Sequence, residues 1–215
     1  MVNDNLILAT SSDGQEITIK DCNDYLKAKD KKKLANFIYD RFYGRYLKPF
    51  DYPTEDYIEN YKNGFALMTS CCLLIETYVS FTEKEFRSTK DKSGKTFGHF
   101  FTTESRFLNL ATGGRKADGT IANKKDGGLP NDFFESVRCG ILHNAETKNG
   151  WTITRNKRIN YFDPTTKVIN ATKFANRLKA VLTDYKKTLL KSDFDNVHIT
   201  AMWTHRSCDG DPPAE

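Results

Sequence analysis

The stretch NDFFESVRCGILHNAETKNGW, residues 131–151, decides how the fold is interpreted. Its apolar residues recur at helical spacing, so it predicts a helix that follows a Gly- and Lys-rich loop. The helix carries Arg138 five residues before His143, one of only four histidines in the chain. Histidine can move a proton near neutral pH, and the arginine fork can hold a phosphate, so the pair could cleave a phosphodiester bond.

The spacing of Arg138 and His143 is weak evidence when taken alone. With ten arginines and four histidines in the chain, such a pair arises readily by chance. On a regular helix, five steps of about 100° place the two side chains roughly 140° apart. They would converge if the arginine wraps around the helix, if the helix is distorted near Gly140, or if a second subunit supplies its own copy. The alternative is an arginine in a salt bridge and a histidine at a helix C-terminus.

The sequence on either side predicts a mostly α fold. We expect an up-and-down bundle of four to five helices with a small β-hairpin appendage, forming a single domain over residues 1–215. Apolar periodicity predicts helices over residues 29–48, 54–86, 93–110, 130–146 and 170–191. The weaker predictions are a short hairpin within residues 1–20 with SSDG as its turn, a hairpin over 151–169 with an RNK turn, and a tail over 192–215.

Bulk composition is typical of a soluble protein. The 215 residues are 38% hydrophobic and carry a net charge of +5, a mild excess that permits a polyanionic partner without requiring one. No signal peptide is visible, and the longest apolar stretch, CCLLI, is too short to span a membrane. Five cysteines, two of them adjacent in an apolar run, suggest reduced core thiols. We therefore expect a cytoplasmic protein with no membrane association.

Two further features could support chemistry on RNA. Glu76 lies in the middle of an apolar predicted helix, where a carboxylate needs a cavity, solvent or a cationic partner. The loop ATGGRKADGTIANKKDGGLP, residues 111–130, is too long for a simple connection. Its candidate contacts to an RNA backbone are Arg115, Lys116, Lys124 and Lys125. The alternative is a lysine-rich loop without such a role.

A zinc site is the remaining candidate for a metal-dependent site in this sequence. His198, His205 and Cys208 lie near the end of the chain but lack a compact fourth ligand. The loop also lacks the Gly-Lys-Ser/Thr of a phosphate-binding P-loop. We expect neither a metal nor a cofactor.

The stretch FFESVRCGILHNAETKNGW, residues 133–151, resembles the motif helix of the HEPN superfamily of helical domains. The family motif is an arginine, four to six residues and then a histidine, on a late helix of a short bundle. LLIETYVSF, residues 73–81, also resembles an earlier helix of that family, which often carries a glutamate. The resemblance implies a metal-independent endoribonuclease, often from a toxin or anti-phage defence system, that works as a homodimer with two motif helices facing each other.

Carried over to this chain, the resemblance makes Arg138 the phosphate-stabilising residue and His143 the acid and base. Asn144 could orient either group, and Glu76 could support them. RNA is the expected partner, together with a second copy of the chain and a regulatory or antitoxin protein. Cys139 stands where active members commonly carry a polar residue, and some members bind without cutting. A non-catalytic module that binds nucleic acid, a nucleotide or a protein is therefore the alternative, and a purely structural helical protein is a third.

Overall fold

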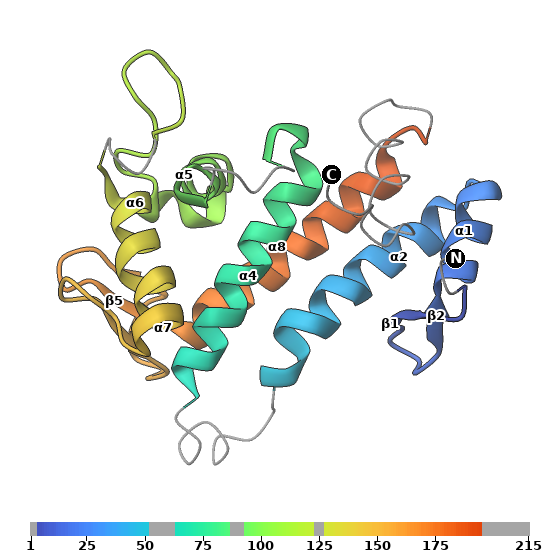
Figure 1. Cartoon of the computed structure of the whole chain (residues 1–215), viewed down its shortest axis with the longest axis horizontal. Coiled ribbons are helices and arrows are strands. Elements are labelled where there is room, and N and C mark those ends of the chain that lie inside the picture. The colour runs from blue at the N-terminus through green and yellow to red at the C-terminus, as the bar shows by residue number, and fades with distance from the viewer. Residues whose placement is uncertain (1–3, 52–62, 87–92, 123–126, 195–215) are drawn as a thin grey trace. The chain divides into compact units, whose positions relative to one another are not determined.

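The computed structural model describes residues 4–51, 63–86, 93–122 and 127–194. This part of the chain is mostly α with two small sheets, so the expected mostly α, helical-bundle-like fold with a small β appendage is confirmed (Figure 1). The chain divides into two compact units, unit 1 (Met1–Pro49 and Lys179–Glu215) and unit 2 (Phe50–Leu178). The single domain expected over residues 1–215 stays a prediction.

Unit 1 begins with the hairpin expected near the N-terminus. Strands β1 (Ile7–Thr10) and β2 (Glu16–Thr18) pair antiparallel, and Gly14 takes a φ of 87° in the turn between them. Thr18 then caps the next helix, because its hydroxyl accepts from the Asp21 N–H while the Asp21 carboxylate accepts from the Thr18 N–H. This reciprocal capping box starts a helix that periodicity did not predict.

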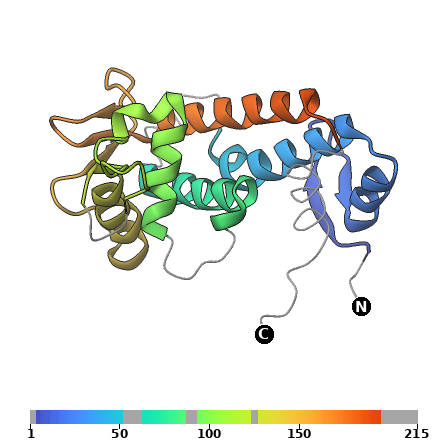
Figure 2. The same cartoon turned by 90° about the horizontal axis from the view of Figure 1, so that it is seen from above.

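Three helical segments and the later part of a long helix complete unit 1. They are α1 (Ile19–Lys27), α2 (Lys31–Phe42) and the π-helical η1 (Tyr43–Leu47), together with the later part of α8 (Ala171–Lys191). Figure 2 shows α8 as one uninterrupted helix. The short 3-10 helix η2 (Lys48–Phe50) follows η1. On α8, the ammonium of Lys179 lies 4.7 Å from the ring centroid of Tyr43, and that of Lys186 lies 5.2 Å from Tyr39. These cation–π contacts join α8 to α2 and η1 within the unit.

Unit 2 carries the predicted motif helix. Its elements are α4 (Gly64–Thr82), η3 (Lys84–Phe86), α5 (Ser93–Thr103), η4 (Ser105–Leu110), α6 (Leu129–Phe133), η6 (Phe134–Arg138), α7 (Cys139–Asn144), β3 (Thr152–Thr154), β4 (Phe162–Asp163), β5 (Val168–Asn170) and the first part of α8. The segments α6, η6 and α7 follow one another without a break, and so form the motif helix.

An aromatic cluster forms the core of unit 2. Phe133 is fully buried, and its ring centroid lies 5.1 Å from that of Phe101 and 5.8 Å from that of Trp151. Phe133 also stacks on Phe174 of α8 at 5.9 Å, and Phe107 approaches Phe174 at 4.9 Å. Each aromatic pair adds about 0.5–1.5 kcal/mol beyond the area it buries. The cluster therefore fixes the motif helix against α5, η4, α8 and the small sheet.

The small sheet of unit 2 differs from the expected hairpin over 151–169. Its strand order is β3-β5-β4, with β3 parallel and β4 antiparallel to β5, so the predicted RNK turn is wrong. The turn lies after Asp163, whose carboxylate accepts the Thr165 N–H at 2.9 Å, and Lys167 takes a φ of 53° before β5. The Asn170 side chain donates to the Asn156 carbonyl at 2.6 Å and holds the irregular segment that replaces the predicted turn.

Helix α4 is long and apolar enough to cross a membrane, the one such helix in the described part of the chain. Its apolar residues include the fully buried Met68, Cys72 and Ile75, as in the core helix of a soluble protein. Burial raises the pKa of the Cys72 thiol, which keeps it protonated. Cys71, Cys72 and Cys139 are free, but Cys22 is disulfide-bonded, so the expectation that all cysteines are reduced is wrong for Cys22.

The motif helix ends at Asn144, two residues before the end of the helix predicted over residues 130–146. Ala145 adopts the left-handed conformation, and its N–H closes onto the Ile141 carbonyl at 3.0 Å. The returning chain then passes so close to Gly140 that a Cβ there would lie 2.6 Å from the Glu146 carbonyl oxygen. Gly140 therefore permits the tight return that ends the helix.

We predict that Gly140→Ala lowers the free energy of unfolding by about 1–3 kcal/mol, because a Cβ forced against backbone must displace it. Gly44→Ala is the matched control, since that helical glycine has nothing within 4 Å of its would-be Cβ and should gain stability or stay unchanged. Urea unfolding followed by circular dichroism measures both. Equal stability of Gly140→Ala and wild type would show that the return is not tightly packed.

Candidate functional site

The motif helix contains a π-helical turn, η6, whose last residue is Arg138. In η6 the Cys139 N–H bonds to the Phe134 carbonyl, one residue further back than in an α-helix. Such π segments occur often at functional sites. The distortion ends at Arg138 itself, and the residues between Arg138 and His143 lie in the regular α-helix α7. The two side chains therefore keep the expected separation of roughly 140° around the helix.

Arg138 forms a two-point ion pair with Glu76 of α4. The Arg138 Nε donates to Glu76 Oε1 at 3.1 Å, and a terminal nitrogen donates to Oε2 at 3.3 Å. The two side chains are only 20% and 21% exposed. Of the environments expected for Glu76, the structure thus shows a cationic partner, and the pair joins the motif helix to α4.

The environment of Arg138 keeps its guanidinium charged. Burial alone would lower its pKa, but the hydrogen bonds and charge of Glu76 outweigh burial and raise it. The Cys139 thiol adds a smaller contribution in the same direction, and the Phe134 ring centroid lies 5.6 Å from the guanidinium carbon. A guanidinium has five N–H donors, and Glu76 takes two, so three remain beyond the carboxylate.

His143 and Asn144 lie at the end of the motif helix. Both are exposed, and within the described residues neither side chain has a hydrogen-bond or ionic partner. In particular, no hydrogen bond joins His143 to Arg138 within one chain in this described part. A histidine of this kind is accessible to a ligand or to a second protein molecule.

A polar network that the sequence analysis did not identify holds the motif helix in place. The buried Ser136 hydroxyl donates to Asp132 at 2.8 Å and accepts from the Asn149 amide at 2.9 Å. Lys167 donates to the other Asp132 oxygen at 2.8 Å, and the Lys148 N–H bonds to the Ser136 carbonyl at 3.0 Å. Asp132 therefore ties the motif helix to the residue directly before β5. Its i, i+4 spacing to Ser136 is the one signal of this network in the sequence.

Burial would raise the pKa of Asp132, but hydrogen bonds from Lys167 and Ser136 outweigh it and lower the pKa. The carboxylate therefore stays ionised at neutral pH. Because the folded pKa is depressed, this stabilisation is present above the unfolded pKa and is lost as the pH falls through the folded value.

In Figure 1 the described part of the predicted RNA-binding loop lies by α6, at the opposite end of the motif helix from α7, which carries His143. Arg115 and Lys116 are exposed in a small hairpin-like turn, in which the Arg115 guanidinium donates to the Gly119 carbonyl at 2.8 Å. The loop returns to the helix through a Leu129 N–H bond to the Thr112 carbonyl. At 1.5 Å per residue, the helix separates this end from His143 by roughly 20 Å. Lys124 and Lys125 lie outside the described residues.

Exposed apolar side chains flank the Arg138–Glu76 pair. Leu73 lies about one turn before Glu76 on α4, and Leu142 lies about one turn after Arg138 on α7. Leu73 is 38% exposed and Leu142 is 40% exposed. An apolar rim beside a polar centre is typical of a surface that another protein covers.

Within the described ranges, no cluster of three or more His, Cys, Asp or Glu side chains could hold a metal ion. His198, His205 and Cys208 lie outside those ranges. Within the described part of the chain, the predicted site therefore consists of Arg138, His143 and their neighbours.

Comparison with known proteins adds no further assignment. No protein-family model, no curated protein and no solved structure matches the chain.

A double-mutant cycle tests the Arg138–Glu76 pair. We expect Arg138→Ala and Glu76→Ala to show a coupling of about 1–2 kcal/mol in the free energy of unfolding, because both side chains are mostly buried and doubly hydrogen-bonded. The control cycle uses Lys187 and Asp184, an exposed pair at 3.1 Å whose coupling should stay below about 0.5 kcal/mol. A coupling at Arg138–Glu76 no larger than the control would mean that the pair does not hold the helices together.

Proposed function

We propose that the chain is a metal-independent endoribonuclease that acts as a homodimer, with Arg138 and His143 as its catalytic residues. The observation that carries this proposal is the arrangement at the end of the motif helix. Glu76 holds the Arg138 guanidinium in one orientation with donors remaining, and His143 is exposed one and a half turns further on. The resemblance of this helix to the HEPN motif supports the same assignment.

The chemistry requires one proton acceptor and one phosphate-binding group. His143 takes the proton from a ribose 2′-hydroxyl, and the 2′-oxygen attacks the adjacent phosphorus. A bond forms between that oxygen and phosphorus as the bond to the 5′-oxygen breaks, and a protonated histidine donates to the leaving oxygen. Arg138 stabilises the charge on the phosphate oxygens. The products are a 2′,3′-cyclic phosphate and a 5′-hydroxyl, and the role that we propose for Asn144 is to orient either Arg138 or His143.

A homodimer resolves the geometry of the two side chains. Within one chain the helical spacing of Arg138 and His143 directs them to different sides of the motif helix, so one copy supplies the arginine and the other the histidine. Leu73 and Leu142 form an apolar rim around Arg138 and Glu76, which a second motif helix would cover. The toxin or defence setting and a regulatory or antitoxin partner follow from the family resemblance and belong to this proposal.

One observation favours the non-catalytic alternative. Glu76 already neutralises Arg138, and a carboxylate beside a phosphate site opposes anion binding. In that reading the ion pair only joins two helices, and the same surface binds a nucleic acid, a nucleotide or a protein without cutting. Cleavage assays on variants at the site separate the two functions.

We predict that His143→Ala lowers the rate of RNA cleavage by a factor of about 10² to 10⁴ while the fold stays intact, because it removes the acid and base. Arg138→Lys should also fail to cleave, since an ammonium lacks the bidentate fork, yet it should bind RNA better than Arg138→Ala. Cys139→Ser is the control and should retain activity. The assay incubates purified protein with total RNA, with and without EDTA, which should make no difference.

Cleavage that persists in His143→Ala, and is missing from a mock purification, would overturn the catalytic assignment of His143. Absence of cleavage by the wild-type protein, with RNA binding retained, would support the binding module instead.

We predict that Leu142→Glu and Leu73→Glu turn a wild-type dimer into a monomer, because each places a charge in the apolar rim. Leu108→Glu is the matched control, since Leu108 of η4 is 53% exposed but lies away from the motif helix along the chain. Light scattering after size exclusion measures the mass. A monomeric wild-type protein at micromolar concentration would count against a composite site.

A further inference from the structure

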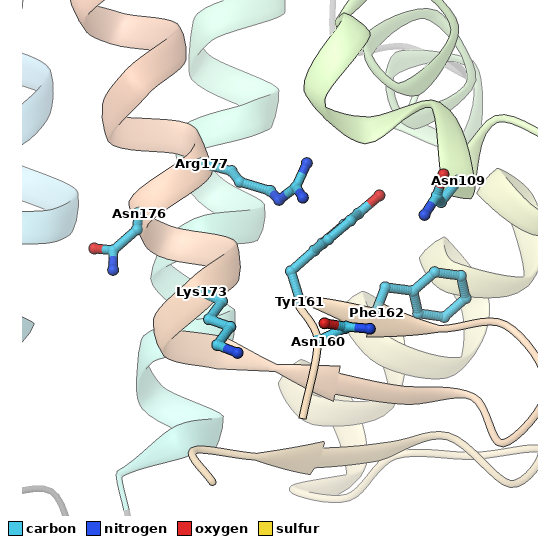
Figure 3. Close-up of a pocket in the computed structure, with 7 residues that line it drawn as sticks. All are labelled: Asn109, Asn160, Tyr161, Phe162, Lys173, Asn176 and Arg177. Carbon is cyan, nitrogen blue, oxygen red and sulfur yellow. The ribbon is translucent and has the colours of Figure 1, made fainter. Parts of the chain in front are cut away.

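Unit 2 holds a pocket of about 480 Å³ that is separate from the site at Arg138 and His143. It is formed by η4, the start of β4 and the first turns of α8, and Figure 3 shows its lining. The polar residues that line it are Asn109, Asn160, Tyr161, Lys173, Asn176 and Arg177. No carboxylate is among the described residues that line it, so their formal charge is +2 from one lysine and one arginine.

Arg177 is fixed over the ring of Tyr161. The guanidinium carbon lies 3.7 Å from the ring centroid, and Arg177 also donates to the Arg106 carbonyl. In Figure 3 the Arg177 side chain extends from α8 toward Tyr161, and Asn109 lies on the opposite side of Tyr161, next to its hydroxyl. The cation is thus held in the pocket wall without an acidic partner there.

The Tyr161 hydroxyl is buried and makes no hydrogen bond of ordinary geometry within the described residues, although the Asn109 backbone comes close enough to affect it. Burial raises the pKa of this phenol against the opposing charge of Arg177, so it stays protonated at neutral pH. A protonated phenol is a hydrogen-bond donor. A buried donor without a partner costs about 1–3 kcal/mol, which a ligand acceptor would recover.

Lys173 adds a second cation on the same face of α8. It lies four residues before Arg177, so the two side chains are neighbours. The backbone N–H of Lys173 donates to the side-chain oxygen of Asn170, which caps α8. Lys173 therefore lies in the first turn of α8, where the helix dipole is positive. Within the described residues its ammonium has no ionic or hydrogen-bond partner.

We propose that this pocket binds the phosphate group of a small phosphorylated ligand, with Lys173, Arg177 and the Tyr161 hydroxyl as the phosphate contacts. Two cations and a neutral donor around one space match the charge and acceptor oxygens of a phosphate. The amides of Asn109 and Asn160 are donors and acceptors suited to the hydroxyl groups of a sugar. A volume of about 480 Å³ accommodates a phosphosugar.

The test is isothermal titration of the full chain with four probes: ribose 5-phosphate, ribose, inorganic phosphate and a short RNA without a terminal phosphate. We expect ribose 5-phosphate to bind, ribose not to bind, and inorganic phosphate to bind more weakly than ribose 5-phosphate. Lys173→Ala should weaken binding of ribose 5-phosphate about 10-fold or more, because it removes a charge-assisted contact. Tyr161→Phe removes only the hydroxyl and should also weaken binding.

Lys187→Ala is the matched control, because Lys187 lies on the same helix but is exposed and outside the pocket. It should bind the phosphosugar as the wild type does. The pocket proposal stands apart from the cleavage reaction, so RNA cleavage by Lys173→Ala should equal that of the wild type.

The proposal is overturned by no binding of ribose 5-phosphate, by equal binding of ribose and ribose 5-phosphate, or by binding of the phosphosugar that Lys173→Ala leaves unchanged. Binding of the RNA alone, weakened by Lys173→Ala, would also overturn it, because the pocket would then contact an RNA backbone. None of these results bears on His143, so the failure of this proposal and that of the ribonuclease proposal are distinguishable.

Discussion

The burial of Phe133 is the constraint on which the rest of unit 2 depends. Its ring contacts α5, α8 and the residue that precedes the small sheet, and it is the last residue of α6 before the π-helical turn. With that ring fixed, Ser136 and Val137 are directed into the core and Arg138 emerges at the edge that faces Glu76. The position of the guanidinium is thus a consequence of aromatic packing one turn earlier.

Sequence periodicity predicted the helices well because their buried faces are defined by local spacing. Leu34, Phe37 and Ile38 on α2 are examples, and all three are buried. It also indicated that Glu76 would need a cavity, solvent or a cationic partner, but not that it pairs with Arg138, since the two lie 62 residues apart in the chain. The π-helical turn and the parallel pairing of β3 with β5 depend on tertiary contacts, which a local pattern does not contain.

The two basic sites of unit 2 have opposite electrostatic designs. Arg138 is held by a carboxylate, so an anion must share it with Glu76 and must gain contacts elsewhere to bind. Lys173 and Arg177 share their pocket with no carboxylate among its described lining residues, so their positive charges are not neutralised there and attract an anion. The first arrangement suits a group that is positioned for a reaction, and the second suits a site that retains a ligand. Sequence spacing did not reveal the second site because its walls come from η4, β4 and α8.

The central claim is a composite site in which the arginine and the histidine come from different copies of the chain. Mixing equal amounts of Arg138→Ala and His143→Ala protein, with subunit exchange, tests this claim most directly. Each variant alone should be inactive, but a mixed dimer has one site with both residues intact, so activity should return to about a quarter of the wild-type level. If the mixture exchanges subunits and stays inactive, Arg138 and His143 do not act across a dimer interface, and the account is wrong.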